Sequence, residues 1–357
     1  MDPGALVPGA EGIPAPAGWF QALLLATFVL HLLFMNAMLG GSVIALTQSL
    51  LPKGPASQHG PDHLIAKKLP YVVALTVNLG IPPLLFLQVL YGHFIYASSV
   101  LMAVWWIAVF LLVMAAYYAA YIYDFKFEAL QKARWLIIGL AVACLLAVGF
   151  VFTNNMTLML QPASWPAYFA NPRGTILNLS EPILIPRYLH FVIASLAVGG
   201  LAAALLGSWR AKRGQAGGER LVSLGLGWFI WATLAQLADG VWFLLSLPRE
   251  FMLMFLGVSL SHTAVLWSGV GAALLAVGLA MKGRSWHAAG ALVAAVSCMV
   301  VARDLLRQAY LKPYFSLDDL TVTPQYSPAL VFGACLAAMV VLIVWMLRQA
   351  LKAGRES

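Results

Sequence analysis

The stretch YLHFVIASLAVGG, residues 188–200, is apolar almost throughout and yet contains His190. It belongs to a longer apolar run, residues 184–209, which is long enough to cross a bilayer as an α-helix. Hydrocarbon offers an imidazole nitrogen no hydrogen-bond partner, so a histidine there needs a neighbouring helix, a metal or a cofactor beside it. The run therefore predicts a membrane span, and its histidine predicts a partner within that span.

The composition of the whole chain indicates a polytopic membrane protein. Of its 357 residues, 62% are hydrophobic and 10% are charged, whereas a soluble globular chain is about half apolar and about a quarter charged. We expect an all-α bundle of about nine transmembrane helices in one domain, residues 19–351, between a flexible outer tail (1–18) and an inner tail (352–357). The expected spans are 19–51, 69–98, 100–123, 134–160, 184–209, 220–247, 250–281, 285–311 and 327–350.

The lysine and arginine residues predict the orientation of these spans. Loops on the cytoplasmic side of a membrane carry an excess of both. With the N-terminus outside, fifteen of the 21 lysine and arginine residues fall on the inner side and six on the outer side. We therefore expect the N-terminus outside and the C-terminus inside. The net charge of +8 then reflects topology and does not indicate binding to nucleic acid.

Polar residues within the expected spans gather in the outer half of the membrane. They include Gln88, Asn154, Arg187, His190, Asp239, Arg303, Asp304 and Arg307, while His31 and His262 fall near mid-membrane. Charged groups inside a span are costly and tend to face a bundle interior or a cavity. We therefore expect one polar site in the outer half, enclosed by the first, second, fifth, seventh and eighth spans.

Haem iron is the natural partner for His31, His190 and His262. Neutral imidazole is a good axial ligand, and apolar helices can enclose a porphyrin. Small residues in MLGGS (38–42) and VGG (198–200) suggest room between helices, and Arg307 could pair with a haem propionate. Simpler alternatives stay open, because a histidine can hydrogen-bond a neighbouring helix and Asp304 with Arg307 can form a structural ion pair. The three cysteines form no CxxC or CxxCH motif, which predicts neither structural zinc nor covalently attached haem.

Several segments, in order along the chain, resemble subunit I of cytochrome bd quinol oxidase. LHLLFMNAMLG (30–40) is similar to the histidine-bearing first helix of that family, which implies that His31 ligates a haem of the active-site pair. YLHFVIASLAVGG is similar to the helix whose histidine ligates the low-spin haem b, here His190. ARDLLRQAY (302–310) is similar to a stretch with an acidic ligand followed by Arg-Gln, which implies a role as weak ligand or proton acceptor for Asp304.

The chain departs from the family in ways that bear on oxygen reduction. VNLGIPPLLFLQVLYG (77–92) is similar to a segment with a buried glutamate on a proton route, but the position is Gln88, and glutamine cannot relay a proton by ionising. The second ligand of the low-spin haem is a methionine in the family. Here that position is Trp267, and His262 is the candidate replacement. The family's large outer loop between helices 6 and 7 shrinks to SLPRE (246–250).

The resemblance implies one to three haems b, with quinol or quinone as the substrate. It also implies other membrane or outer-side redox subunits as partners, such as a c-type cytochrome, and a location in the bacterial inner (cytoplasmic) membrane. We therefore expect the membrane subunit of a respiratory complex that transfers electrons between quinol and an outer-side partner. Two alternatives remain: a true terminal oxidase that reduces oxygen, and a haem-free transporter or membrane anchor.

Overall fold

The computed structural model describes residues 3–51 and 60–356, and this part of the chain holds helices and one isolated β-bridge but no strand. Eight helices are long and apolar enough to cross a membrane, so the protein is a multi-pass membrane protein. They are α1 (Ala17–Leu50), α3 (Leu69–Leu101), α4 (Ala103–Phe125), α6 (Arg134–Leu160), α8 (Leu184–Lys212), α9 (Gly218–Ser246), α11 (Leu260–Met281) and α12 (Ser285–Leu311). Helical backbone satisfies its own hydrogen bonds in lipid, which is why long apolar runs form helices.

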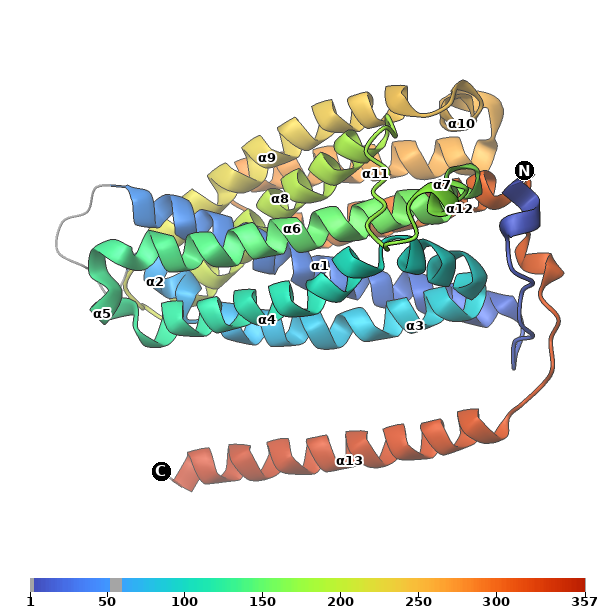
Figure 1. Ribbon diagram of the computed structural model, residues 1–357. Helices are drawn as coiled ribbons and strands as arrows, with labels where there is room; N and C mark the ends of the chain where they lie inside the picture. The colour runs from blue at the N-terminus through green and yellow to red at the C-terminus, as the bar shows by residue number, and fades with distance from the viewer. Residues whose placement is uncertain (1–2, 52–59, 357) are drawn as a thin grey trace.

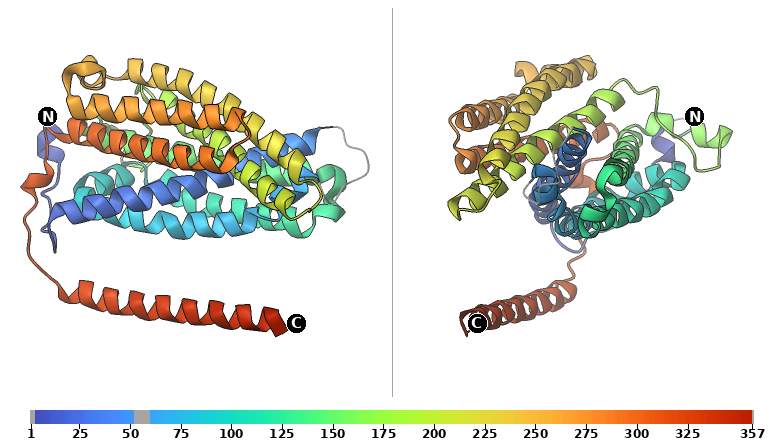
Figure 2. Two further views of the ribbon diagram at one scale, coloured as in Figure 1. Left: turned by 180° about the vertical axis from the view of Figure 1, so that it is seen from behind. Right: turned by 90° about the vertical axis from the view of Figure 1, so that its left-hand side faces the viewer.

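The eight helices lie side by side and alternate in direction, as Figures 1 and 2 show. One end of the bundle holds the start of α1, α4, α8 and α11 and the end of α3, α6, α9 and α12, and we call it the N-terminal end. Four short helices connect the long ones: α2 (Pro61–Ala66) and α5 (Phe127–Leu130) at the opposite end, and α7 (Ala167–Ala170) and α10 (Arg249–Leu253) at the N-terminal end. The bundle therefore brings distant parts of the sequence together at each end.

Glycine residues draw three of the helices into direct backbone contact. A Cβ atom on Gly40 of α1 would collide with the carbonyl oxygen of Ser195 on α8, and one on Gly200 would lie 2.7 Å from the backbone nitrogen of Phe229 on α9. Small residues allow this close approach between membrane helices. The glycines of residues 38–42 and 198–200 thus close the seams between α1, α8 and α9, where we expected them to leave room.

The seventh expected span is broken. In place of one helix over residues 250–281, α10 is followed by a π-helical turn at Met254–Val258, and α11 begins only at Leu260. Gly257 has a φ of +126°, a conformation that side-chain-bearing residues avoid, so the chain turns there. His262 is consequently the third residue of α11, and the expected position about twelve residues into a continuous helix is wrong.

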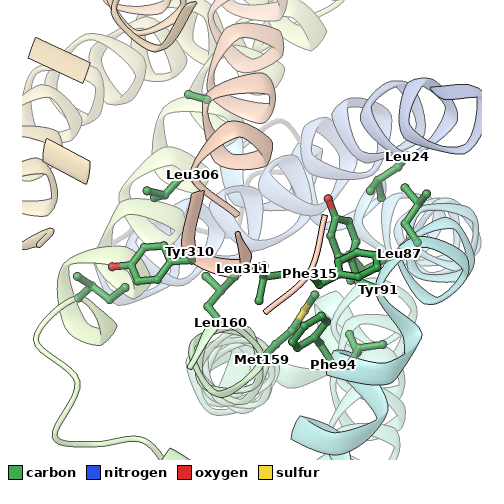
Figure 3. Close-up of a cluster of buried hydrophobic side chains, with 14 of the residues drawn as sticks. Leu24, Leu87, Tyr91, Phe94, Met159, Leu160, Leu306, Tyr310, Leu311 and Phe315 are labelled. Carbon is green, nitrogen blue, oxygen red and sulfur yellow. The ribbon is translucent and has the colours of Figure 1, made fainter. Parts of the chain in front are cut away.

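A hydrophobic core fills the N-terminal end of the bundle. It is built from α1, α3, α6 and α12 and from the segment after α12, and Figure 3 labels ten of its side chains. Phe315, from that last segment, packs edge-on against Tyr91, with ring centroids 6.1 Å apart. Tyr91 is also the residue at which α3 departs from helical φ and ψ, while Pro82 and Pro83 lie within continuous helix. The irregularity in α3 therefore lies beside this core.

The last expected span forms a helix that stands apart from the bundle. This helix, α13 (Ser327–Glu356), contains an apolar stretch of Leu330–Met346, which is shorter than the eight candidate spans. Figures 1 and 2 show it separated from the other helices. The segment before it pairs with the start of the chain, because the Ile13 N–H donates to the Thr321 carbonyl at 2.8 Å and Ile13 is buried. Part of the expected flexible outer tail is thus paired with residues near α13.

Candidate functional site

His190 meets a carboxylate on the neighbouring helix. Its Nδ1 lies 2.9 Å from Oδ2 of Asp239, which joins α8 to α9 across their seam. Asp239 is buried and the side chain of His190 is 25% exposed. An ionised carboxylate only accepts hydrogen bonds, so Nδ1 carries the hydrogen and Nε2 of the neutral ring keeps its lone pair. Metal-ligating histidines are commonly held in this way, through the nitrogen that does not bind the metal.

His31 is held by a backbone carbonyl in the seam between α1 and α3. Its Nδ1 lies 3.2 Å from the carbonyl oxygen of Thr76, which can only accept, so Nδ1 is again the donor. The ring packs against Gly80, where a Cβ atom would come within 2.9 Å of Cε1. His31 therefore has a fixed tautomer when neutral, with Nε2 as its remaining basic atom.

His262 has one nitrogen paired and one without a partner. Its Nδ1 lies 2.8 Å from the hydroxyl oxygen of Ser259, the residue just before α11. Its Nε2 is buried and makes no hydrogen bond to any residue that the structure describes. The ring packs edge-on against Phe255, with centroids 5.1 Å apart. In all three histidines, then, Nδ1 makes the structural contact.

The carboxylate of Asp304 is fully hydrogen-bonded. Its Oδ1 accepts from Nη1 of Arg307 at 2.7 Å, the i, i+3 ion pair that the sequence indicates. Its Oδ2 accepts from Nε2 of Gln21 on α1 at 2.7 Å and from Nε2 of Gln308 at 2.8 Å. These contacts join α12 to α1 and give the carboxylate a structural role, while its predicted role as weak ligand or proton acceptor stays a prediction.

Gln88 lies on α3, partly buried, and among the described residues it has no hydrogen-bond partner. No described group of three or more His, Cys, Asp or Glu side chains is arranged to hold a metal ion. His31, His190 and His262 instead occupy separate places: the α1–α3 seam, the α8–α9 seam and the start of α11. The structure thus joins His190 with Asp239, and Asp304 with Arg307, but it does not gather the histidines into one cluster.

A cavity of about 20 Å³ lies near the N-terminal end, between α6, α8 and α12. Its seven lining residues are Met156, Met159, Leu160, Arg187, Arg303, Leu306 and Arg307. Three of these are arginines and none is acidic. Figure 3 labels three of the lining residues, Met159 and Leu160 on α6 and Leu306 on α12.

Two of the cavity arginines contact aromatic rings and no carboxylate. Within the described residues, Arg187 and Arg303 make neither a side-chain hydrogen bond nor a salt bridge. The guanidinium of Arg187 lies 5.5 Å from the ring centre of Phe243, which also packs beside His190. The guanidinium of Arg303 lies 4.5 Å from the ring centre of Phe28. Through Phe243, the His190–Asp239 pair therefore adjoins the arginine cavity.

Sequence reasoning missed two features of this site. It placed Arg187 and Arg303 in the outer polar layer but gave them no role. Their similar depth in the membrane was the signal that could have indicated a shared site. It also overlooked Gln21, the one amide side chain before His31 in α1, as a partner for Asp304. The site also includes residues of α6 and α9, which were not among the five spans predicted to enclose it.

No protein-family model matches the chain, and no curated protein matches it. The assignment of a function therefore depends on the geometry of these residues and on the resemblance stated above.

Proposed function

We propose that this protein is a haem b-binding, bd-like membrane cytochrome subunit. It would transfer electrons between quinol in the bilayer and a redox partner, such as a c-type cytochrome, at the N-terminal end of the bundle. The observation that carries the proposal is the His190–Asp239 pair, because it fixes the imidazole with Nε2 as the free basic atom. The excess of lysine and arginine at the opposite end supports an outer position for the N-terminal end in a bacterial inner membrane.

The donor set suits haem better than a metal ion bound by protein alone. A single histidine can hold a haem iron, so a haem at His190 does not require the three histidines to meet. When bound, haem b supplies one-electron oxidation and reduction at its iron. Asp239 would orient His190 and raise the basicity of its Nε2. His262, whose buried Nε2 lacks a partner, is the proposed second ligand of the same haem.

His31 is the proposed ligand of a second haem. The Thr76 carbonyl fixes its tautomer, as Asp239 does for His190. Near this second haem, Asp304 and Arg307 would have a structural role, because they hold α12 against α1. Arg307 has donors beyond the one directed at Asp304, so a propionate could share its guanidinium. Gln88 cannot ionise, which favours electron transfer over oxygen reduction.

The haem content of the purified full-length protein tests the proposal. Pyridine haemochrome quantification should give at least one haem b per chain after expression with ample haem. A value of two or more supports His31 as a further ligand. A protein that folds as a monodisperse helical species but contains no haem would contradict the proposal.

Oxygen consumption separates this proposal from a true terminal oxidase. Turnover with a reduced quinol that is lost in His31→Ala would favour an oxidase that functions with Gln88. A normal haem spectrum without oxygen consumption would favour the electron-transfer subunit.

A haem-free transporter is the second candidate, and the break at Met254–Val258 favours it specifically. Transporters often bind substrates at discontinuous helices, where unwound backbone and helix ends face a cavity. The arginine cavity would then belong to an anionic substrate. Absence of haem, together with uptake of an anion into vesicles containing the protein, would favour this candidate.

A further inference from the structure

The arginine cavity carries an inference that stands apart from haem binding. Arg187, Arg303 and Arg307 all line one small, partly open space; Arg187 and Arg307 are 8% and 5% exposed, and Arg303 is partly buried. Of the three, only Arg307 pairs with a carboxylate there, that of Asp304. We propose that this cavity is a binding site for an oxyanion, the carboxylate or phosphate group of a small ligand or headgroup.

The charge balance of the cavity favours such a partner. Placing a cation away from water is costly unless an opposite charge and hydrogen bonds compensate for it. The rings of Phe243 and Phe28 supply part of this compensation by cation–π contact. Glu181 lies within electrostatic range of Arg187 and supplies part of the opposite charge, although it forms no salt bridge with it. The acidic neighbour of Arg303 is Asp304, whose single charge is shared with Arg307, so the three arginines outnumber the nearby carboxylates.

The position of the cavity indicates how an anion would reach it. Arg187 is the fourth residue of α8, and Arg307 is four residues from the end of α12, so the site lies close to the N-terminal end of the bundle. A space of about 20 Å³ holds roughly one water molecule, so an oxyanion would need it to widen, which the flexible Met156 and Met159 allow. An anionic head could enter between the helices with the rest of the ligand outside. Guanidinium groups suit this chemistry because they bind carboxylate and phosphate through paired donors.

Binding measurements on the full-length protein in neutral detergent test the site. Inorganic phosphate is titrated while thermal unfolding is followed, and native mass spectrometry detects retained phosphatidylglycerol. We expect at least one of these probes to bind, and Arg303→Gln to weaken that binding by about tenfold or more. Arg173→Gln, an exposed arginine at the same end, is the matched control and should bind as the unaltered protein does.

Unfolding without any added anion provides a second readout. Arg303→Gln removes a partly buried charge that has no salt bridge among the described residues, so the variant should unfold at the same or a higher temperature than the unaltered protein in lipid-free, phosphate-free detergent. A lower unfolding temperature, combined with no response of the unaltered protein to either probe, would show that Arg303 is only structural and would overturn the proposal. Equal binding by Arg303→Gln and the unaltered protein would overturn it as well.

Haem measured on the same samples separates this site from the proposed function. Loss of haem in Arg303→Gln, with no response to phosphate or lipid, would identify a haem propionate as the oxyanion. Binding of phosphate or lipid to a protein without haem would support the anion site while contradicting the cytochrome assignment.

Discussion

At the scale of single residues, hydrogen-bond chemistry decides which atoms remain available. His190 and His31 both direct Nδ1 at groups that can only accept, so each neutral ring presents Nε2 as its basic atom. Asp304 is the opposite case, because three donors already surround its carboxylate. The structure therefore favours His190 over Asp304 as a ligand.

The role of Asp239 can be tested by Asp239→Asn. An amide in place of the carboxylate weakens the hold on Nδ1 and lowers the basicity of Nε2, so haem retention should fall by about 10–100-fold. Haem per chain during titration with haem measures the effect. An unchanged haem affinity in a folded variant would remove Asp239 from the site.

The ion pair at Asp304 should be important for stability. Asp304→Ala leaves the buried guanidinium of Arg307 without its partner, and breaking a buried pair in this way costs about 3–5 kcal/mol. Thermal unfolding in detergent should show a large loss for this variant. Asp318→Asn, at an exposed position, is the control and should unfold as the unaltered protein does. Equal stability of both variants would argue against a structural role for the pair.

At the scale of elements, glycine decides where helices meet. Gly40→Leu would drive α1 away from Ser195 on α8 and should destabilise the bundle strongly. Gly290→Ala on α12 has open space around its Cβ position, so it should be neutral or stabilising by up to about 1 kcal/mol. Thermal unfolding of the two variants provides the comparison. Similar effects for both would contradict the close approach of α1 and α8.

The positions of the helices follow from hydropathy, whereas their breaks and contacts do not. The run 134–160 predicts α6 residue for residue, because an apolar segment of that length has only helix available in lipid. The break before His262 arises from Gly257, and one glycine within an apolar run gives no such signal. Likewise, the glycines at 38–42 and 198–200 indicate close contact or open space equally well until their neighbours are known.

The sequence predicts the membrane depth of the candidate site, but not which side chains contact each other within it. Membrane depth placed Arg187, His190, Asp239 and Arg303 together, because each lies near the same end of its helix. Depth does not give the rotation of a helix, so the pairing of His190 with Asp239 and the aromatic contacts of Arg187 and Arg303 required the structure.

At the scale of the whole molecule, orientation determines which side a redox partner approaches. With the N-terminal end outside, a cysteine introduced for Arg173 should react with a membrane-impermeant thiol reagent on intact cells. One introduced for Lys126, at the opposite end, should react only after the membrane is opened. The reverse pattern would place the candidate site at the inner surface and exclude an outer-side partner.

The reduced-minus-oxidised spectrum of the purified protein, recorded for the unaltered chain and for His190→Ala, tests the central claim most directly. His287→Ala is the matched control, because His287 is the third residue of α12 and is exposed. We predict a b-type band in the unaltered and His287→Ala proteins that is lost or strongly reduced in His190→Ala. A b-type band of full intensity in folded His190→Ala, or no band in any of the three proteins, would contradict the account.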